Sequence, residues 1–71
     1  MVRCKFICDE KLQTTNGYSV VMIPVTHGST ENENFFKWTP WGKLEIGVIS
    51  DEVIKKFEVG KEYYLDITLV Q

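Results

Sequence analysis

Aromatic and cationic side chains crowd into one short stretch of the chain, NENFFKWTPWGK at residues 32–43. The stretch holds four of the nine aromatic residues of the chain and two lysines, namely Phe35, Phe36, Lys37, Trp38, Trp41 and Lys43. Aromatic rings stack on the bases of nucleotides, and each stacked base is worth about 1–3 kcal/mol. Ammonium groups pair with phosphate oxygens. This combination predicts a site for a flat, anionic ligand.

The polar segment THGSTENEN, residues 26–34, comes directly before the aromatic stretch and is expected to be a long loop. Its hydroxyl, imidazole and amide groups can hydrogen-bond a ligand, and Asn32 and Asn34 are candidates for contacts with base edges. Arg3 is a further candidate for a phosphate contact. The predicted ligand-binding residues are His27, Ser29, Asn32, Asn34, Phe35, Lys37, Thr39, Trp41 and Lys43, together with Arg3 and Tyr64.

For Trp41 and Tyr64, a structural role is the alternative to ligand binding. Trp41 is expected in a turn, where it either stacks on a ligand or folds back as a lid over one end of a small core. One of the adjacent Tyr63 and Tyr64 must point away from the core, and Tyr64 is the predicted outward one, on the face of Asp66. It belongs to a binding surface, a subunit interface or the ordinary solvated surface.

No catalytic residue, metal site or cofactor is predicted. His27 is the only histidine, and no G-x-S-x-G motif surrounds Ser29, so a serine nucleophile lacks its usual base and turn. The glycines are isolated, which excludes a glycine-rich phosphate loop. Cys4 and Cys8 would lie roughly 13 Å apart along a strand, beyond disulfide reach, and are expected to be small buried apolar residues.

Composition places the chain among small globular proteins with a single domain over residues 1–71. Apolar residues make up 44% of the chain and charged residues 25%, which argues against disorder. The net charge of −2 does not favour a general nucleic-acid binder, because such proteins carry a basic stripe. No apolar run approaches a membrane span of about 18 residues, and MVRCKFICDE has no signal-peptide core, so a cytoplasmic protein is expected.

Alternation of apolar and polar residues predicts strands at residues 2–8, 18–25, 35–39, 43–49 and 62–70. In the third of these, Phe36 and Trp38 are expected to face the core. Asn16-Gly17 and the segment 39–42 predict tight turns, and Pro24 predicts an edge or a bulge at its end of the second strand. Ser50 is the expected N-cap of a helix of about two turns, with Val53, Ile54 and Phe57 on its apolar face.

This order of elements predicts an all-β (mainly β) fold: a small five-stranded SH3-like or OB-like barrel with one short helix before the last strand. The SH3-like and OB-like barrels are both retained as alternatives, because an error in the predicted number of strands would turn one assignment into the other. A chain of 71 residues buries only about 60% of its unfolded surface. Small domains of this kind often recruit a second copy, so a homo-oligomer is also expected.

Residues 23–66 resemble a family of short, mostly uncharacterised bacteriophage accessory proteins. The shared patterns are P-V-x-x-G-S-x-E-N-x-x-F-x-K-x-T-P-x-G and F-E-x-G-K-E-Y-Y-x-D. They match Pro24, Val25, Gly28, Ser29, Glu31, Asn32, Phe35, Lys37, Thr39, Pro40, Gly42, Phe57, Glu58, Gly60, Lys61, Glu62, Tyr63, Tyr64 and Asp66. Trp41 departs from the family, in which that turn position is usually small or polar.

The resemblance implies a phage protein that acts in the cytoplasm of an infected bacterial cell against host defence. The expected function is non-enzymatic binding and sequestration of a cyclic-nucleotide immune signal, a cyclic oligonucleotide of the kind used in CBASS defence. The first alternative is direct binding to a host defence protein. The second is a barrel that binds single-stranded nucleic acid, which predicts an affinity that falls steeply with salt.

Overall fold

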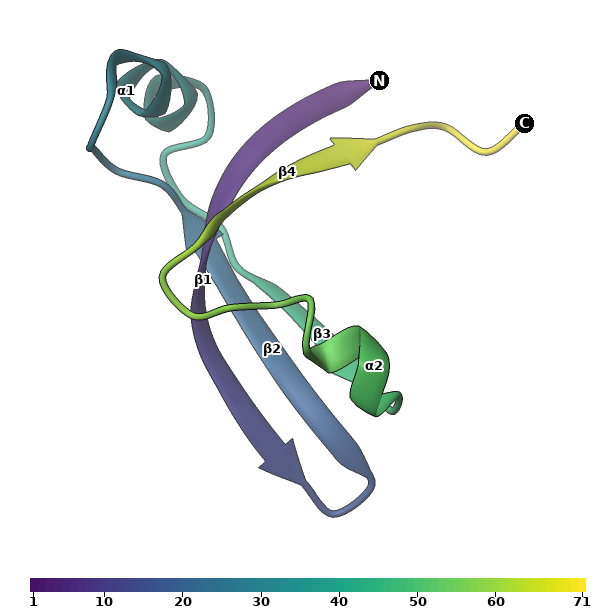
Figure 1. Cartoon of the computed structure of the whole chain (residues 1–71). Helices are drawn as coiled ribbons and strands as arrows, with labels where there is room; N and C mark the ends of the chain where they lie inside the picture. Colours follow the sequence, from purple (N-terminus) through teal and green to yellow (C-terminus); the bar gives the residue numbers. More distant parts are fainter.

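Four antiparallel strands and two short helices make up the computed structural model, which describes residues 1–71 (Figure 1). They follow the order β1 (Val2–Thr14), β2 (Gly17–Pro24), α1 (Thr30–Trp38), β3 (Leu44–Val48), α2 (Asp51–Ile54) and β4 (Glu62–Ile67). The strands form one sheet in the order β3-β2-β1-β4. The fold is therefore mostly β, as predicted, but it has four strands where five were expected.

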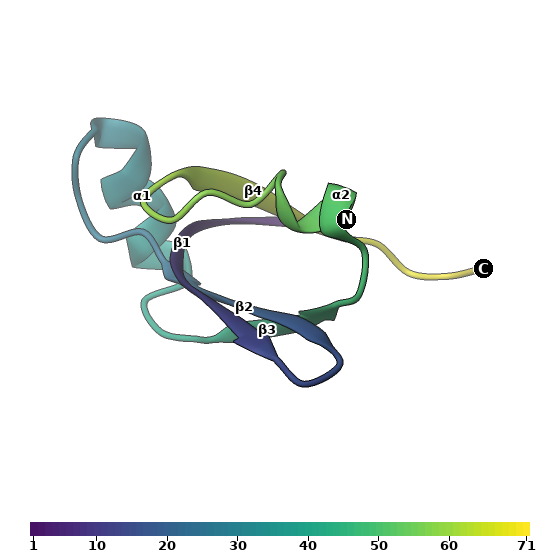
Figure 2. The same cartoon turned by 60° about the horizontal axis from the view of Figure 1, so that its bottom comes forward.

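The sheet curls into a half-barrel rather than a closed barrel (Figure 2). Its edge strands, β3 and β4, are each paired on one side only. The radius of gyration is 13.1 Å, against about 11 Å for a compact chain of this length. The chain therefore folds into an open shape, with α2 beside the hollow of the curl (Figure 2).

The core lies on the inner face of the curl and follows the alternation of β1. Cys4, Phe6 and Cys8 are buried there, as predicted, and Val20 and Met22 of β2 are buried against them. Val48 and Ile54 complete the buried cluster. Both cysteines are free and buried, so they act as small apolar groups, and burial raises the pKa of Cys8.

The β1–β2 hairpin is longer than the sequence pattern indicated. β1 continues through the polar segment after Cys8, with a bulge between Cys8 and Glu10, and turns at residues 15–16. Gly17 has a φ of +151°, and a Cβ on it would lie 2.5 Å from the carbonyl oxygen of Val48 on β3. Glycine is needed here because the neighbouring strand approaches its backbone so closely.

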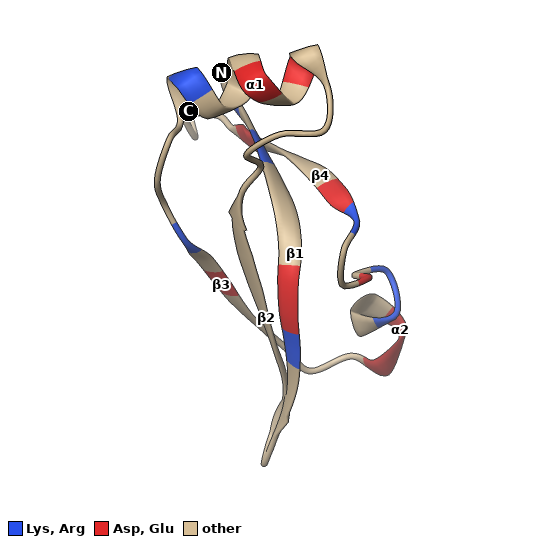
Figure 3. Ribbon diagram, turned by 90° about the vertical axis from the view of Figure 1, so that its left-hand side faces the viewer, with Lys and Arg blue, Asp and Glu red and all other residues tan.

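The predicted strand at residues 35–39 is wrong, because these residues belong to the end of α1 and its C-cap. Ser29 is the N-cap and its hydroxyl accepts a hydrogen bond from the backbone N–H of Asn32. Acidic residues lie in the first turn and Lys37 in the last, which suits the helix dipole (Figure 3). Phe36 and Trp38 are consequently exposed, at 37% and 71%, and are not core residues.

The predictions for the remaining connections are confirmed only in part. Ser50 caps α2 as expected, although the helix spans only four residues, and Ile54 enters the core. Pro24 ends β2 beyond its last pair with β3, Met22–Leu44, so no β3 residue needs a hydrogen bond from it. The predicted tight turn at residues 39–42 is instead a bend without a backbone hydrogen bond of its own.

Candidate functional site

A cluster of charged side chains lies on the outer face of β1 and β4, opposite the core. Register pairs Arg3 with Asp66 and Lys5 with Tyr64, and α1 adds a carboxylate from its first turn. We call this group the outer cluster; it consists of Arg3, Lys5, Glu31, Glu62, Tyr64 and Asp66. Two positive and three negative side chains give it a net charge of −1.

Arg3 is already paired within this cluster. Its guanidinium donates two hydrogen bonds to the carboxylate of Asp66, at 2.7 and 3.0 Å, and its Cζ lies 4.6 Å from the centroid of the Tyr64 ring. The hydrogen bonds raise the pKa of Arg3 and lower the pKa of Asp66. A phosphate would have to displace Asp66, so Arg3 is not a free anion-binding group.

Lys5 joins α1 to β4. Its Nζ lies 2.6 Å from Glu31 Oε2 and 3.4 Å from Glu62 Oε1, and its side chain is only 13% exposed. The hydroxyl of Tyr64 donates to the same Glu31 oxygen at 2.8 Å. These contacts lower the pKa of Glu31 and raise the pKa of Lys5 and of Tyr64. The ion pairs therefore fix α1 against the sheet.

Asn32 is the one polar side chain of α1 that is fully buried, with 2% of its surface exposed. Its Nδ2 donates to the backbone oxygen of His27 at 3.0 Å and to Glu62 Oε2 at 2.7 Å. Its Oδ1 is buried without a hydrogen-bond partner. The side chain ties the start of the helix to β4 and is not available to read the edge of a base.

The aromatic side chains of the stretch separate into two groups. Phe35 is half-buried, with its ring centroid 5.5 Å from that of Trp38 and 6.0 Å from that of Tyr64. Trp38 and Trp41 present most of their surface to solvent, and Trp41 is 83% exposed. The alternative role of Trp41 as a core lid is therefore wrong for the chain by itself.

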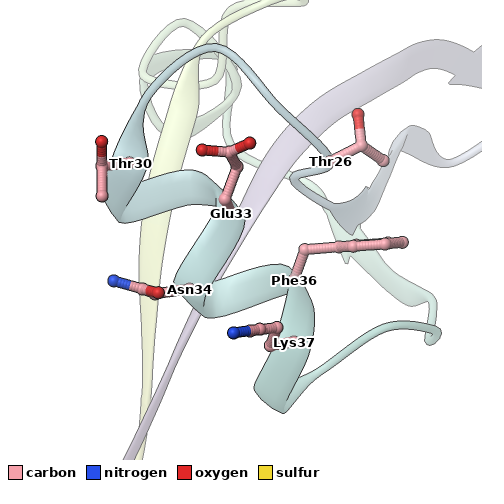
Figure 4. A pocket seen from close by; sticks show the side chains of 6 residues that line it. All are labelled: Thr26, Thr30, Glu33, Asn34, Phe36 and Lys37. Atoms are coloured by element: carbon pink, nitrogen blue, oxygen red, sulfur yellow. The ribbon is translucent and has the colours of Figure 1, made fainter.

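An open cavity of about 420 Å³ lies beside α1, and none of its lining residues belongs to the outer cluster (Figure 4). Side chains from the start of the connection and from α1 line it: Thr26, Thr30, Glu33, Asn34, Phe36 and Lys37. Lys37 makes no ion pair within the chain. Of the predicted site residues, Asn34 and Lys37 meet at this cavity.

The other predicted residues are spread over the molecule. Ser29 is engaged as the N-cap, and the hydroxyl of the half-buried Thr39 reaches Cys4 Sγ at 3.7 Å. His27 is exposed, with its Nδ1 2.7 Å from the hydroxyl of Thr26. Lys43 is exposed in the connection to β3. The sequence prediction therefore combined two different surfaces and several structural residues into one site.

Four cavity residues were not among the predicted ligand-binding residues: Thr26, Thr30, Glu33 and Phe36, the last of which was expected to face the core. For Thr30 and Glu33 the signal is the helical period, which places both on the helix face of Lys37, whereas on a strand Thr30 would point to the opposite face. A second open cavity, of about 270 Å³, lies where the β1–β2 turn meets the end of β3 and was also missed. Its lining contains no charged side chain and consists of Thr14, Asn16, Gly17, Tyr18, Gly47, Val48 and Ile49.

The arrangement supplies groups that can bind a ligand. The Thr26 hydroxyl and the His27 ring are within hydrogen-bond distance, but they are neighbours on an exposed connection and no third group orients the ring. No three His, Cys, Asp or Glu side chains gather where they could hold a metal ion. The cavity groups are suited to hydrogen bonding, stacking and the neutralisation of one negative charge.

Comparisons of the chain with models of known protein families, with characterised proteins and with solved structures give no match. What defines the class of this protein is therefore its own geometry: a curled, four-stranded antiparallel half-barrel with a solvent-facing helix. Neither helix has the length and apolar sequence that a membrane crossing requires.

Proposed function

We propose that the protein is a non-enzymatic binding protein that sequesters a cyclic nucleotide at the cavity on α1. The observation that carries the proposal is that Phe36, Asn34 and the unpaired Lys37 all line one cavity (Figure 4). Its volume of about 420 Å³ falls within the range of roughly 300–1,000 Å³ that is usual for ligand sites. The cavity is thus large enough for a base and its phosphate.

Each group at the cavity matches one part of such a ligand. The Phe36 ring, 37% exposed, offers a face on which a base can stack. The ammonium of Lys37 can meet a phosphodiester, which carries a single negative charge. Asn34 and the threonine hydroxyls can hydrogen-bond base edges, and Glu33 can accept hydrogen bonds from a ribose hydroxyl. One lysine beside one glutamate suits a ligand of low charge rather than a long polyanion.

The resemblance of residues 23–66 to phage accessory proteins supports a biological setting for this binding. In that setting the protein acts in the cytoplasm of an infected bacterial cell and removes a cyclic oligonucleotide signal of host defence. We also propose that the half-barrel is related to SH3-like or OB-like barrels.

Calorimetric titration with a panel of cyclic di- and trinucleotides tests the proposal. At least one member should bind, and Lys37→Gln should weaken that binding by about tenfold, corresponding to about 1.4 kcal/mol. Lys43→Gln is the matched control, because it removes the same charge from an exposed lysine outside the cavity. Absence of binding across the panel, or equal losses in the two variants, would contradict the proposal.

Direct binding to a host protein is the second candidate, and the exposure of Trp38 and Trp41 favours it. The two indoles lie at the end of α1 and just after it, outside the cavity. Tryptophan is the residue type most enriched among interface residues that dominate binding energy. An exposed pair of this kind is typical of an anchor for a protein partner.

A pull-down from host lysate distinguishes the two candidates. Protein binding predicts that one dominant host protein is recovered and that a Trp38→Ala/Trp41→Ala double variant loses it. Lys37→Gln should leave that recovery unchanged, since Lys37 lies in the cavity. Recovery that is unaffected by loss of both indoles would remove the second candidate.

A further inference from the structure

The apolar stripe of the inner face continues past the core along β1 and β4. Register pairs Phe6 with Tyr63, Cys4 with Leu65, and Val2 with Ile67, so these residues form one row. The first two pairs belong to the core or pack against it. Val2 and Ile67 are mostly exposed, at 59% and 62%. The apolar surface of the inner face is therefore left exposed at the end formed by Val2 and Ile67.

The segment that follows β4 is also apolar and exposed. Residues 68–71 leave the sheet, and Leu69 and Val70 are 80% and 91% exposed. The N-terminal end of β1 and this tail project together beyond the rest of the molecule (Figure 1). Monomeric soluble proteins rarely leave an apolar surface of this kind uncovered.

β4 is also a free sheet edge, and although the strand carries Glu62 and Asp66, the residues after Asp66 lack the usual protection. Its outer side presents unpaired backbone N–H and C=O groups, which can accept another strand. The opposite edge, β3, is five residues long and carries Glu45 and Gly47, features that discourage pairing. Residues 67–70, by contrast, contain no charge, glycine or proline. The two edges thus differ in their capacity to pair.

We propose that two copies of the chain form a dimer through β4 and residues 68–71, paired antiparallel across a two-fold axis. A second copy is the occupant because the edge is complementary to itself. Side chains alternate between the two faces of a strand. The apolar side chains of both copies therefore lie on the same face of the joined sheet only if the two-fold axis passes at a residue, which then faces its own copy, and not between two residues. The candidates along the strand are registers centred on Leu65, Asp66 or Ile67.

The charges and the exposed residues select one of these registers. Centring on Asp66 would place two carboxylates opposite each other, which is destabilising. Centring on Leu65 would place Leu69 opposite Lys61 of the second copy. Centring on Ile67 places Leu69 opposite Leu65 and opposes no like charges. The dimer is therefore assigned the register in which Ile67 faces Ile67 of the second copy.

Sedimentation of the full chain over a range of concentrations tests the dimer, whose mass should be twice the 8.2 kDa of the chain. Ile67→Lys should weaken association by about tenfold or more, because it places two ammonium groups together in an apolar contact. Ile49→Lys is the matched control, since Ile49 is 84% exposed and lies outside the edge. Circular dichroism should show that both variants keep the fold.

A monomer at all concentrations would overturn the dimer. A dimer that is equally tight in Ile67→Lys would overturn its location at β4. Neither result bears on the proposed nucleotide site, because no cavity residue belongs to this edge. Failure of the dimer and failure of ligand binding can therefore be told apart.

Disulfide cross-linking tests the register. In the proposed pairing the two copies of residue 67 face each other with Cα atoms about 4.5–5.5 Å apart, within disulfide reach. Oxidised glutathione should therefore convert Ile67→Cys to a covalent dimer. In Leu69→Cys the two thiols are four residues out of register, roughly 13 Å apart, and should not cross-link. Cys4 and Cys8 are buried and contribute little background. Equal or reversed yields in the two variants would overturn the register.

Discussion

The two faces of the β1–β4 ladder hold the structure together in different ways. On the inner face, Phe6 and Cys4 are buried among apolar side chains. On the outer face, Arg3 and Lys5 are paired with carboxylates from β4 and α1. Burial of apolar surface is non-directional, whereas the ion pairs require particular geometry. The inner face should therefore supply stability, and the outer face should position α1 and its cavity.

Phe6→Ala, on the inner face, should cause the largest loss in the free energy of unfolding. The Phe6 side chain is buried in the centre of the core, and a Cβ on Gly42 would lie 3.5 Å from its ring. Truncation leaves a cavity and should lower the free energy of unfolding by about 3–5 kcal/mol. Urea unfolding measures the loss. Phe36→Ala is the matched control on exposed α1, and an equal loss there would show that the core is not where we place it.

Asn32→Ala should have the next largest effect, because it breaks the buried link between α1 and β4. The substitution leaves the backbone oxygen of His27 and one oxygen of Glu62 without their donor. We expect the free energy of unfolding to fall by about 1–3 kcal/mol. Asn34→Ala removes the same group from the exposed side of the helix and should change stability by less than about 0.5 kcal/mol. Equal effects would mean that Asn32 has no special structural role.

The inner face could be predicted from the sequence because its signal is local. The period of two in β1 placed Cys4, Phe6 and Cys8 on the core side, and the N-cap position of Ser50 was also evident. In β4 the same alternation correctly placed Tyr64 on the outer face, away from Tyr63. These assignments depend on neighbours one or two residues away.

The outer face could not be predicted in the same way. Aromatic residues at 35–38 favoured a strand by propensity, but Ser29 with acids in the next turn favoured a helix, and the helix formed. The partners of Lys5 and Arg3 come from residues 26 to 63 positions away in the chain. No local pattern indicates such pairs, so Arg3 was assigned to a phosphate although it is bound to Asp66.

Acid titration should show the contribution of the outer face to stability, and this effect should be smaller than those of Phe6→Ala and Asn32→Ala. Hydrogen bonds from Lys5 lower the pKa of Glu31, and those from Arg3 lower the pKa of Asp66. A lowered pKa in the folded state favours the charged form, so the contribution is complete above the unfolded carboxyl pKa values of about 4. It is lost as the pH falls through the lowered folded values. Exposure and salt keep the effect small.

Urea midpoints measured from pH 7 to pH 2 test this expectation. The Glu31→Gln/Asp66→Asn double variant should lose less stability on acidification than the unmodified chain. Glu33→Gln is a control, because Glu33 makes no ion pair. An unchanged slope in the double variant would mean that the outer cluster does not contribute to stability at neutral pH.

Trp41→Ala should have the smallest effect on stability and sharpens the comparison most directly. A lid over the core would cost about 3–5 kcal/mol on truncation, as a buried aromatic residue does. Trp41 is 83% exposed, so the change in the free energy of unfolding should stay within about 0.5 kcal/mol. Trp38→Ala should cost slightly more, since the Trp38 ring packs edge-on against Phe35. A large loss for Trp41 would show that the indole is buried in solution.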